Sequence, residues 1–166
     1  MAENVRTVSI GEMVVSNNPD DVLVAYGLGS CVAICMYDRS TGVGGMLHAL
    51  LPSAPDGPSG QGTPTKFVTQ GVPQLLAGMT RMGANPSRLI VQVYGGAHML
   101  AAPGFKNALN IGERNVQAAE SALKAAGLQV RHQDTGGQAG RTVRLHVADG
   151  QVVVKTRGQE ELIMIR

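Results

Sequence analysis

VLVAYGLGSCVAICMYDRSTGVGGMLHALLP, residues 22–52, contains three apolar segments separated by glycine-rich and polar turns. The segments 22–26, 31–37 and 45–51 predict three β-strands, because short apolar runs bounded by turn residues are typical of buried strands. The polar turn at 38–42 joins the second strand to the third, so we expect these two to pair antiparallel. The quick succession of all three predicts a meander.

Cys31 and His48 are the candidate catalytic residues of this stretch. Cys31 follows Gly27, Gly29 and Ser30 at the start of its strand, where glycines let a substrate approach and backbone N–H groups face an oxyanion. Antiparallel pairing would bring His48 beside it, and the imidazole could then take the thiol proton and form a thiolate near neutral pH.

Core packing is the competing interpretation, because free cysteines are among the most buried residues. We adopt it for Cys35, which lies inside the strand with no glycine before it. At Cys31 the preceding glycines and the nearby histidine favour a catalytic role, and the two interpretations are about equally supported there. His98, which follows Gly95-Gly96, is a weaker candidate than His48 and is more simply a surface or packed residue.

The composition limits the classes of function. The chain has 166 residues, a formal net charge of +2, 3% aromatic residues and no tryptophan, with its basic residues scattered, which argues against nucleic acid binding. Two cysteines cannot build a zinc site and fit a reduced compartment. Neither a signal peptide nor a membrane-spanning run is visible. We therefore expect one cytoplasmic domain, residues 1–166, without membrane insertion, metal or other cofactor.

Further strands and helices are predicted outside this stretch. A helix is expected at 66–82, kinked by Pro73 or starting there, and another at 110–126, with Asn110 and Glu113 as a capping box. A loop at 53–65 is most simply a connection, although it could also act as a flap. The remaining strands are expected at 5–15, 88–94, 128–134, 143–147, 152–155 and 160–166.

The order of these elements predicts the fold class. Many short strands, a hairpin across Asp149-Gly150 and two main helices indicate an α+β protein, in which helices cover a largely antiparallel sheet or sandwich. No internal repeat or interdomain linker is visible in the sequence.

Several separated motifs together resemble the CheD family, the chemoreceptor glutamine deamidases of bacterial and archaeal chemotaxis. They occur in the family's order over nearly the whole chain, and their combination is specific although each alone is weak. The matching segments are GLGSCVAICMYD at 27–38, GVGGMLHALLP at 42–52, the helix after Lys66, YGGAHML at 94–100, NIGERNVQAAESAL at 110–123 and QDTGGQAGRTV at 133–143.

The resemblance implies a β-sandwich flanked by helices, similar to bacterial deamidase toxins. It also implies an amidohydrolase that converts glutamines of methyl-accepting chemotaxis receptors to glutamate and releases ammonia. By position, Cys31 would be the nucleophile and His48 the general base, with backbone N–H groups around Ser30 and Cys31 holding the oxyanion.

This chain departs from the family at one position. The family's third catalytic residue is a threonine six residues before the cysteine, where this sequence has Ala25. A methyl group cannot orient the imidazole, so another group must do so. A hydroxyl group such as that of Ser30, Tyr26 or Thr65 is a candidate.

Two other functions stay open. CheD proteins also bind and stimulate the chemotaxis phosphatase CheC, so the chain could act mainly as a binding partner with weak or absent catalysis because of Ala25. Retention of Cys31 and His48 argues against complete loss of catalysis. A hydrolase acting on glutamyl methyl esters is the third possibility, because the same thiolate can attack an ester.

Overall fold

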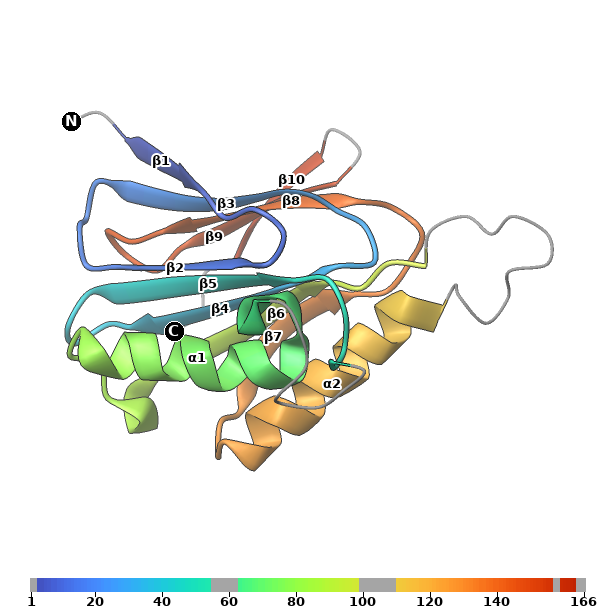
Figure 1. Cartoon of the computed structure of the whole chain (residues 1–166). Coiled ribbons are helices and arrows are strands. Elements are labelled where there is room, and N and C mark those ends of the chain that lie inside the picture. Colours follow the sequence, from blue (N-terminus) through green and yellow to red (C-terminus); the bar gives the residue numbers. More distant parts are fainter. Residues whose placement is uncertain (1–2, 55–62, 99–109, 157–158, 164–166) are drawn as a thin grey trace.

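The computed structural model describes residues 3–54, 63–98, 110–156 and 159–163. Two five-stranded sheets lie face to face, and two helices cover the outer face of one of them, so the described part has three layers (Figure 1). We call the first sheet the open sheet and the second the helix-covered sheet. The helices are α1 (Val68–Arg81) and α2 (Ile111–Ala125).

Each sheet contains strands from both halves of the chain. The open sheet has the order β1 (Asn4–Thr7), β3 (Asp21–Leu28), β8 (Arg141–His146), β9 (Val152–Thr156) and β10 (Gln159–Ile163). The helix-covered sheet has the order β2 (Glu12–Ser16), β5 (Val43–Ala49), β4 (Val32–Asp38), β6 (Ile90–Gly95) and β7 (Val130–Thr135). Among the described strands, β1–β3 and β6–β7 pair in parallel and the other six pairings are antiparallel. The predicted α+β class is confirmed, with mixed sheets that are largely antiparallel.

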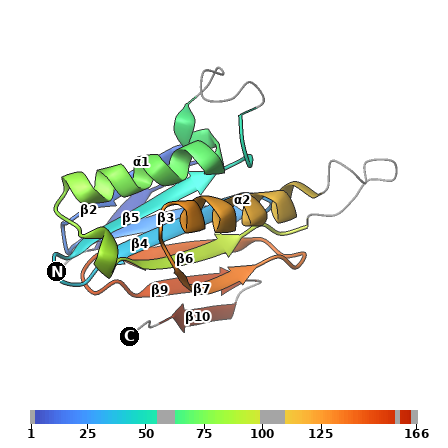
Figure 2. The same cartoon turned by 90° about the horizontal axis from the view of Figure 1, so that it is seen from below.

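The alternation of side chains along β4 and β5 separates two apolar cores. Cys31, Ala33 and Cys35 belong to the core between the sheets, whereas Val32 and Ile34 belong to the core beneath the helices. Figure 2 shows α1 over β2 and β5, and α2 over β4 and β6. The two helices therefore flank the sandwich on one side only. The face of β4 that carries Ala33 and Cys35 is turned toward the open sheet, as is Cys31 just before the strand.

The predicted meander is wrong, because β3 belongs to the open sheet and β4 to the helix-covered sheet. The β3–β8 ladder is irregular between Ala25 and Leu28, and Gly27 has a φ of +60° there. This irregularity and the following Gly29-Ser30 carry the chain from one sheet to the other. Only β4 and β5 form the expected hairpin, in the register Ala33↔His48.

The single strand predicted at 5–15 is also wrong. β1 and β2 lie in different sheets, and the chain crosses between them at residues 8–11. Gly11, with a φ of +81°, ends the crossing, and its N–H donates to the carbonyl of His48 at 2.8 Å. Alternating apolar residues continue through the crossing, so periodicity alone did not reveal it.

Other boundaries agree more closely with the sequence. The hairpin between β8 and β9 is confirmed, and so is the final strand as far as Ile163; residues 164–166 of the predicted strand lie outside the described part. Pro73 lies inside α1, so the helix does not start there, and the side chain of Asn110 makes no capping hydrogen bond at α2, so the predicted capping box is wrong. Of the predicted loop at 53–65, residues 55–62 lie outside the described part, and a short 3-10 helix occupies Pro64–Lys66.

Candidate active site

Cys31 and His48 lie on the same face of the helix-covered sheet. His48 is paired with Ala33 of β4, and Cys31 is two residues before Ala33, so Cys31 and His48 are diagonal neighbours across the hairpin. Cys31 is 7% exposed and His48 is 2% exposed. The antiparallel pairing expected from the sequence is therefore confirmed, and it puts Cys31 and His48 on the face of the hairpin that is turned toward the open sheet.

The crossing segment at residues 8–11 fixes the imidazole of His48. Nδ1 lies 2.9 Å from the carbonyl oxygen of Val8, which can only accept, so Nδ1 carries the proton. The N–H of Val8 in turn donates to Val24 of β3 at 2.8 Å. In the described part of the chain, the buried Nε2 has no hydrogen-bond partner. The ring therefore presents an unprotonated, unpartnered Nε2 inside the protein.

The group that binds the ring is thus a backbone carbonyl and not one of the hydroxyl groups expected from the sequence. Thr65 donates its hydroxyl to the carbonyl of Gly11. Tyr26 is 49% exposed, and its ring lies 5.9 Å from the guanidinium carbon of Arg144. No residue spacing could have identified Val8, because the interaction uses its main chain.

Both titratable groups are neutral at pH 7. Burial lowers the pKa of His48 below its ordinary value of 6.5, against the raising effects of the Val8 carbonyl and the Glu12 carboxylate. Burial raises the pKa of the Cys31 thiol above 9.0, although a hydrogen bond from its own backbone N–H lowers it again in part. Both directions favour the uncharged thiol and imidazole over the thiolate that was expected from the sequence.

Cys35 is the buried core residue that the sequence predicted. It is 1% exposed in the core between the sheets, and burial raises its pKa to about 12. His98, the weaker candidate, is exposed just beyond the end of β6, and its N–H donates to Gly137.

Three consecutive carbonyl groups hold the loop before β4. The carbonyl of Gly29 accepts from Ala97 N–H at 2.8 Å, and that of Cys31 accepts from Gly96 N–H at 2.8 Å. The carbonyl of Ser30 accepts from the side-chain amide of Asn115 at 2.8 Å. The loop is therefore tied to the end of β6 and to the first turns of α2.

Sequence reasoning did not assign a role to Asn115 or to Arg141, although both lie in the motifs that resemble the family. Asn115 is a fully buried polar residue on the apolar face of α2, and that position in the helical pattern is a signal that could have identified it. Arg141 is 7% exposed and donates to the carbonyl of Gly95 at 3.4 Å and to Asp134 at 3.1 Å. It joins the two sheets at the end of β6 that adjoins Cys31.

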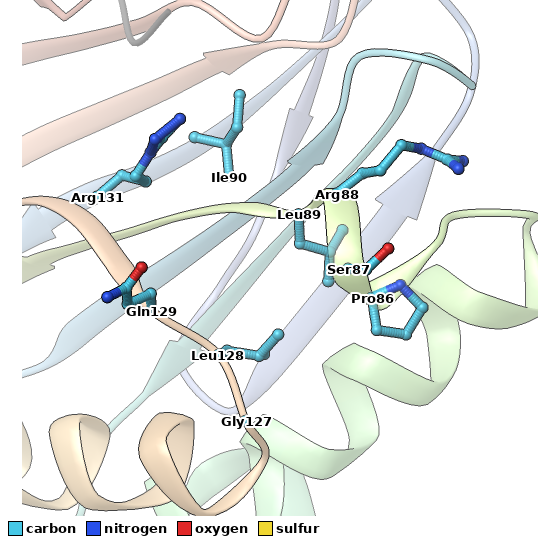
Figure 3. Close-up of a pocket in the computed structure, with 9 residues that line it drawn as sticks. All are labelled: Pro86, Ser87, Arg88, Leu89, Ile90, Gly127, Leu128, Gln129 and Arg131. Carbon is cyan, nitrogen blue, oxygen red and sulfur yellow. The ribbon is translucent and has the colours of Figure 1, made fainter.

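A separate hollow of about 430 Å³ lies between the segment that precedes β6 and the segment that links α2 to β7 (Figure 3). It adjoins Ile90, at the opposite end of β6 from Gly95.

Within the described residues, no group of three or more His, Cys, Asp or Glu side chains is placed to hold a metal ion. No helix in the described part of the chain is long and apolar enough to span a membrane.

Comparison with known proteins identifies the family. Residues 50–156 match the family model described as CheD chemotactic sensory transduction. A "Probable chemoreceptor glutamine deamidase CheD" of Symbiobacterium thermophilum is 40% identical over 159 residues, covering 95% of this chain and 96% of that protein. The chain belongs to the CheD family. Proteins of the same name from Thermococcus kodakarensis (44% identical, 87% of this chain and 88% of that protein) and Methanococcus vannielii (38%, 94% and 97%) also match.

The comparison with solved structures also found two matches at low similarity. They are a Neisseria meningitidis protein described by the family model DUF152 (TM-score 0.47, 12% identity, 81% of this chain and 63% of that one) and the Bacillus licheniformis hypothetical protein YfiH (TM-score 0.41, 14% identity, 80% and 59%).

Proposed function

We propose that this CheD-family chain is a protein-glutamine deamidase that acts on chemoreceptors in the cytoplasm, with Cys31 as nucleophile and His48 as general base. The names of its relatives support the activity and the substrate class. One observation carries the assignment of the residues. Among the described residues, His48 Nε2 is buried without a partner on the face that carries Cys31. Nδ1 is bound to the carbonyl of Val8, and this is the tautomer that a base needs.

The reaction begins from the neutral pair. As the Cys31 sulfur attacks the side-chain carbonyl carbon of the substrate glutamine, the thiol proton passes to His48 Nε2 and the carbonyl oxygen becomes an oxyanion. The backbone N–H of Cys31 lies beside its own sulfur, where it can stabilise that oxyanion together with the N–H of Ser30. The imidazolium then returns its proton to the leaving nitrogen, and ammonia departs from a thioester.

Hydrolysis of the thioester completes the cycle. His48 Nε2 takes a proton from water, whose oxygen attacks the thioester carbon. The tetrahedral intermediate then expels the Cys31 sulfur, which recovers its proton from His48. The net change is glutamine plus water to glutamate plus ammonia, and no cofactor is consumed.

The alternative is that the chain serves mainly as a partner of the phosphatase CheC. The observation that favours it is Ala25, which is fully buried in the core between the sheets and offers no hydroxyl group. Against it, the carbonyl of Val8 already binds Nδ1 of His48, so the imidazole does not need a hydroxyl at position 25 to fix its tautomer.

The deciding experiment incubates the purified protein with a receptor cytoplasmic fragment and measures ammonia release and a one-dalton mass gain per modified glutamine. Turnover is expected for wild type and Cys35→Ala and is expected to be lost in Cys31→Ala and His48→Ala. A wild-type protein that is inactive while Ala25→Thr is active would support the CheC-partner function instead. Methanol release from a methylated fragment, without ammonia release from an unmethylated one, would indicate an esterase.

A further inference from the structure

Asn115 occupies a position that packing alone does not explain. It is fully buried on α2, among the apolar or small residues Gly112, Ala119 and Leu123. Its Nδ2 donates to the carbonyl of Ser30 at 2.8 Å and to the carbonyl of Leu50 at 3.0 Å, while Oδ1 is buried without a partner in the described part of the chain. A buried polar group with an unsatisfied atom costs stability, so an apolar side chain would serve the helix better.

The two carbonyl groups flank the candidate catalytic residues. Ser30 directly precedes Cys31, and Leu50 follows His48 by two residues. The β4–β5 ladder ends at the pair Val32 and Ala49, and beyond it the N–H of Leu50 donates to the carbonyl of Lys66. The amide of Asn115 therefore links the two strands at the step where their own pairing ends.

The helix approaches the loop closely enough to make this link rigid. A β-carbon at Gly112 would lie 2.4 Å from the carbonyl oxygen of Ala97 and 2.6 Å from that of Gly96, so only glycine fits there. Gly96 and Ala97 are the residues whose N–H groups bind Cys31 and Gly29. The first turns of α2, the end of β6 and the loop before Cys31 thus form one packed unit, to which Asn115 contributes a side-chain bond.

We propose that Asn115 is a positioning residue, which holds the Ser30–Cys31 peptide against the end of β5 so that the Cys31 thiol faces His48 Nε2. This inference rests on the proposed function for its effect on turnover, but its effect on the thiol does not depend on that function. Without the amide, the loop keeps its bonds to Gly96 and Ala97 but loses its link to the strand of His48.

The test compares Asn115→Asp, which keeps the shape and removes both donors, and Asn115→Ser, which keeps one donor, with Leu123→Ala. Leu123 is fully buried on the same helix, about 12 Å further along its axis. Each change is made in a Cys35→Ala background. Measured are the melting temperature, the rate of Cys31 alkylation by iodoacetamide between pH 6 and 10, and kcat and KM for deamidation of the receptor fragment.

We expect Asn115→Asp to lower kcat about 10- to 100-fold with KM changed less than about threefold, and to change the pH profile of Cys31 alkylation. Asn115→Ser should fall between it and wild type, and it carries the test if the aspartate variant does not fold. Leu123→Ala should lower the melting temperature while leaving the alkylation profile and kcat near those of the background.

The positioning role would be overturned if kcat fell in both the Asn115 and the Leu123 variants in proportion to the decrease in their melting temperatures. Asn115 would then be a structural residue. If the background protein shows no deamidation, the proposed function fails. The pH profiles of Cys31 alkylation then decide by themselves whether Asn115 is a positioning residue. A profile changed by Asn115→Asp and not by Leu123→Ala supports the positioning role, and identical profiles overturn it.

Discussion

A side chain at Gly95 would collide with the backbone of Cys31, which makes Gly95→Ala a sharp test of how the site is held. A β-carbon there would lie 2.3 Å from the carbonyl oxygen of Cys31, in a residue whose φ is +104°. Real β-carbons essentially never come within 3.0 Å of such an atom, so β6 and Cys31 would have to separate by about 0.7 Å. That shift would stretch the 2.8 Å bond between Gly96 N–H and the Cys31 carbonyl beyond hydrogen-bonding distance.

Gly83 provides a matched control. Its φ is +105°, and a β-carbon there would meet nothing within 4 Å. Gly83→Ala therefore carries the cost of a left-handed backbone, roughly 1–2 kcal/mol, without the clash. Gly95→Ala adds about 1–3 kcal/mol for displaced packing and about 1 kcal/mol for the lost hydrogen bond. We expect its free energy of unfolding to be about 2–4 kcal/mol below that of Gly83→Ala.

Urea unfolding at pH 7 measures the difference directly, and thermal unfolding should show a gap of about 4–16 °C between the two variants. Because the displacement falls at Cys31, kcat for deamidation should also drop at least about tenfold in Gly95→Ala and stay near wild type in Gly83→Ala. Two variants whose unfolding free energies agree within about 0.5 kcal/mol would refute the reasoning, since the contact with Cys31 would then carry no cost.

Three further predictions concern titratable groups. Because His48 has a lowered pKa when folded, the acid limb of kcat/KM should have its midpoint below pH 6.5, and Glu12→Gln should move it lower still; a midpoint above pH 6.5 would contradict this. Alkylation should modify Cys31 and spare Cys35, at a rate still rising above pH 9.0, and a plateau below pH 8.5 would show an activated thiolate instead. Asp38 is fully buried with a bidentate arginine partner and a pKa of about 2, so its contribution to stability is present above pH 3.8 and lost as the pH falls toward 2. Asp38→Asn should cost about 2–3 kcal/mol at pH 7 in urea unfolding and flatten the pH dependence in that acid range.

The sequence predicted the hairpin of β4 and β5 because both strands are continuous apolar runs joined by a polar turn. It could not predict which sheet each strand joins. The strands before and after each crossing, β3 and β4 in one case and β1 and β2 in the other, have the same apolar character. Those crossings depend on single glycines with positive φ, such as Gly11 and Gly27, whose backbone conformation is not visible in the residue type. The sequence could therefore nominate side chains for the candidate site, but not the main-chain groups that hold them.

That distinction bears on Ala25. A threonine that orients the imidazole can be removed by one substitution, whereas a backbone carbonyl is present whatever residue stands at position 8. The Val8 carbonyl keeps its place because the N–H of Val8 is bound to Val24 of β3, and because Gly11 is bound to the carbonyl of His48. The same crossing thus fixes both the strand and the ring of His48. If His48 is the base that we propose, an alanine at position 25 is compatible with its role for this reason. The cost of lacking a hydroxyl group there should then appear as a rate difference between wild type and Ala25→Thr and not as an absence of turnover.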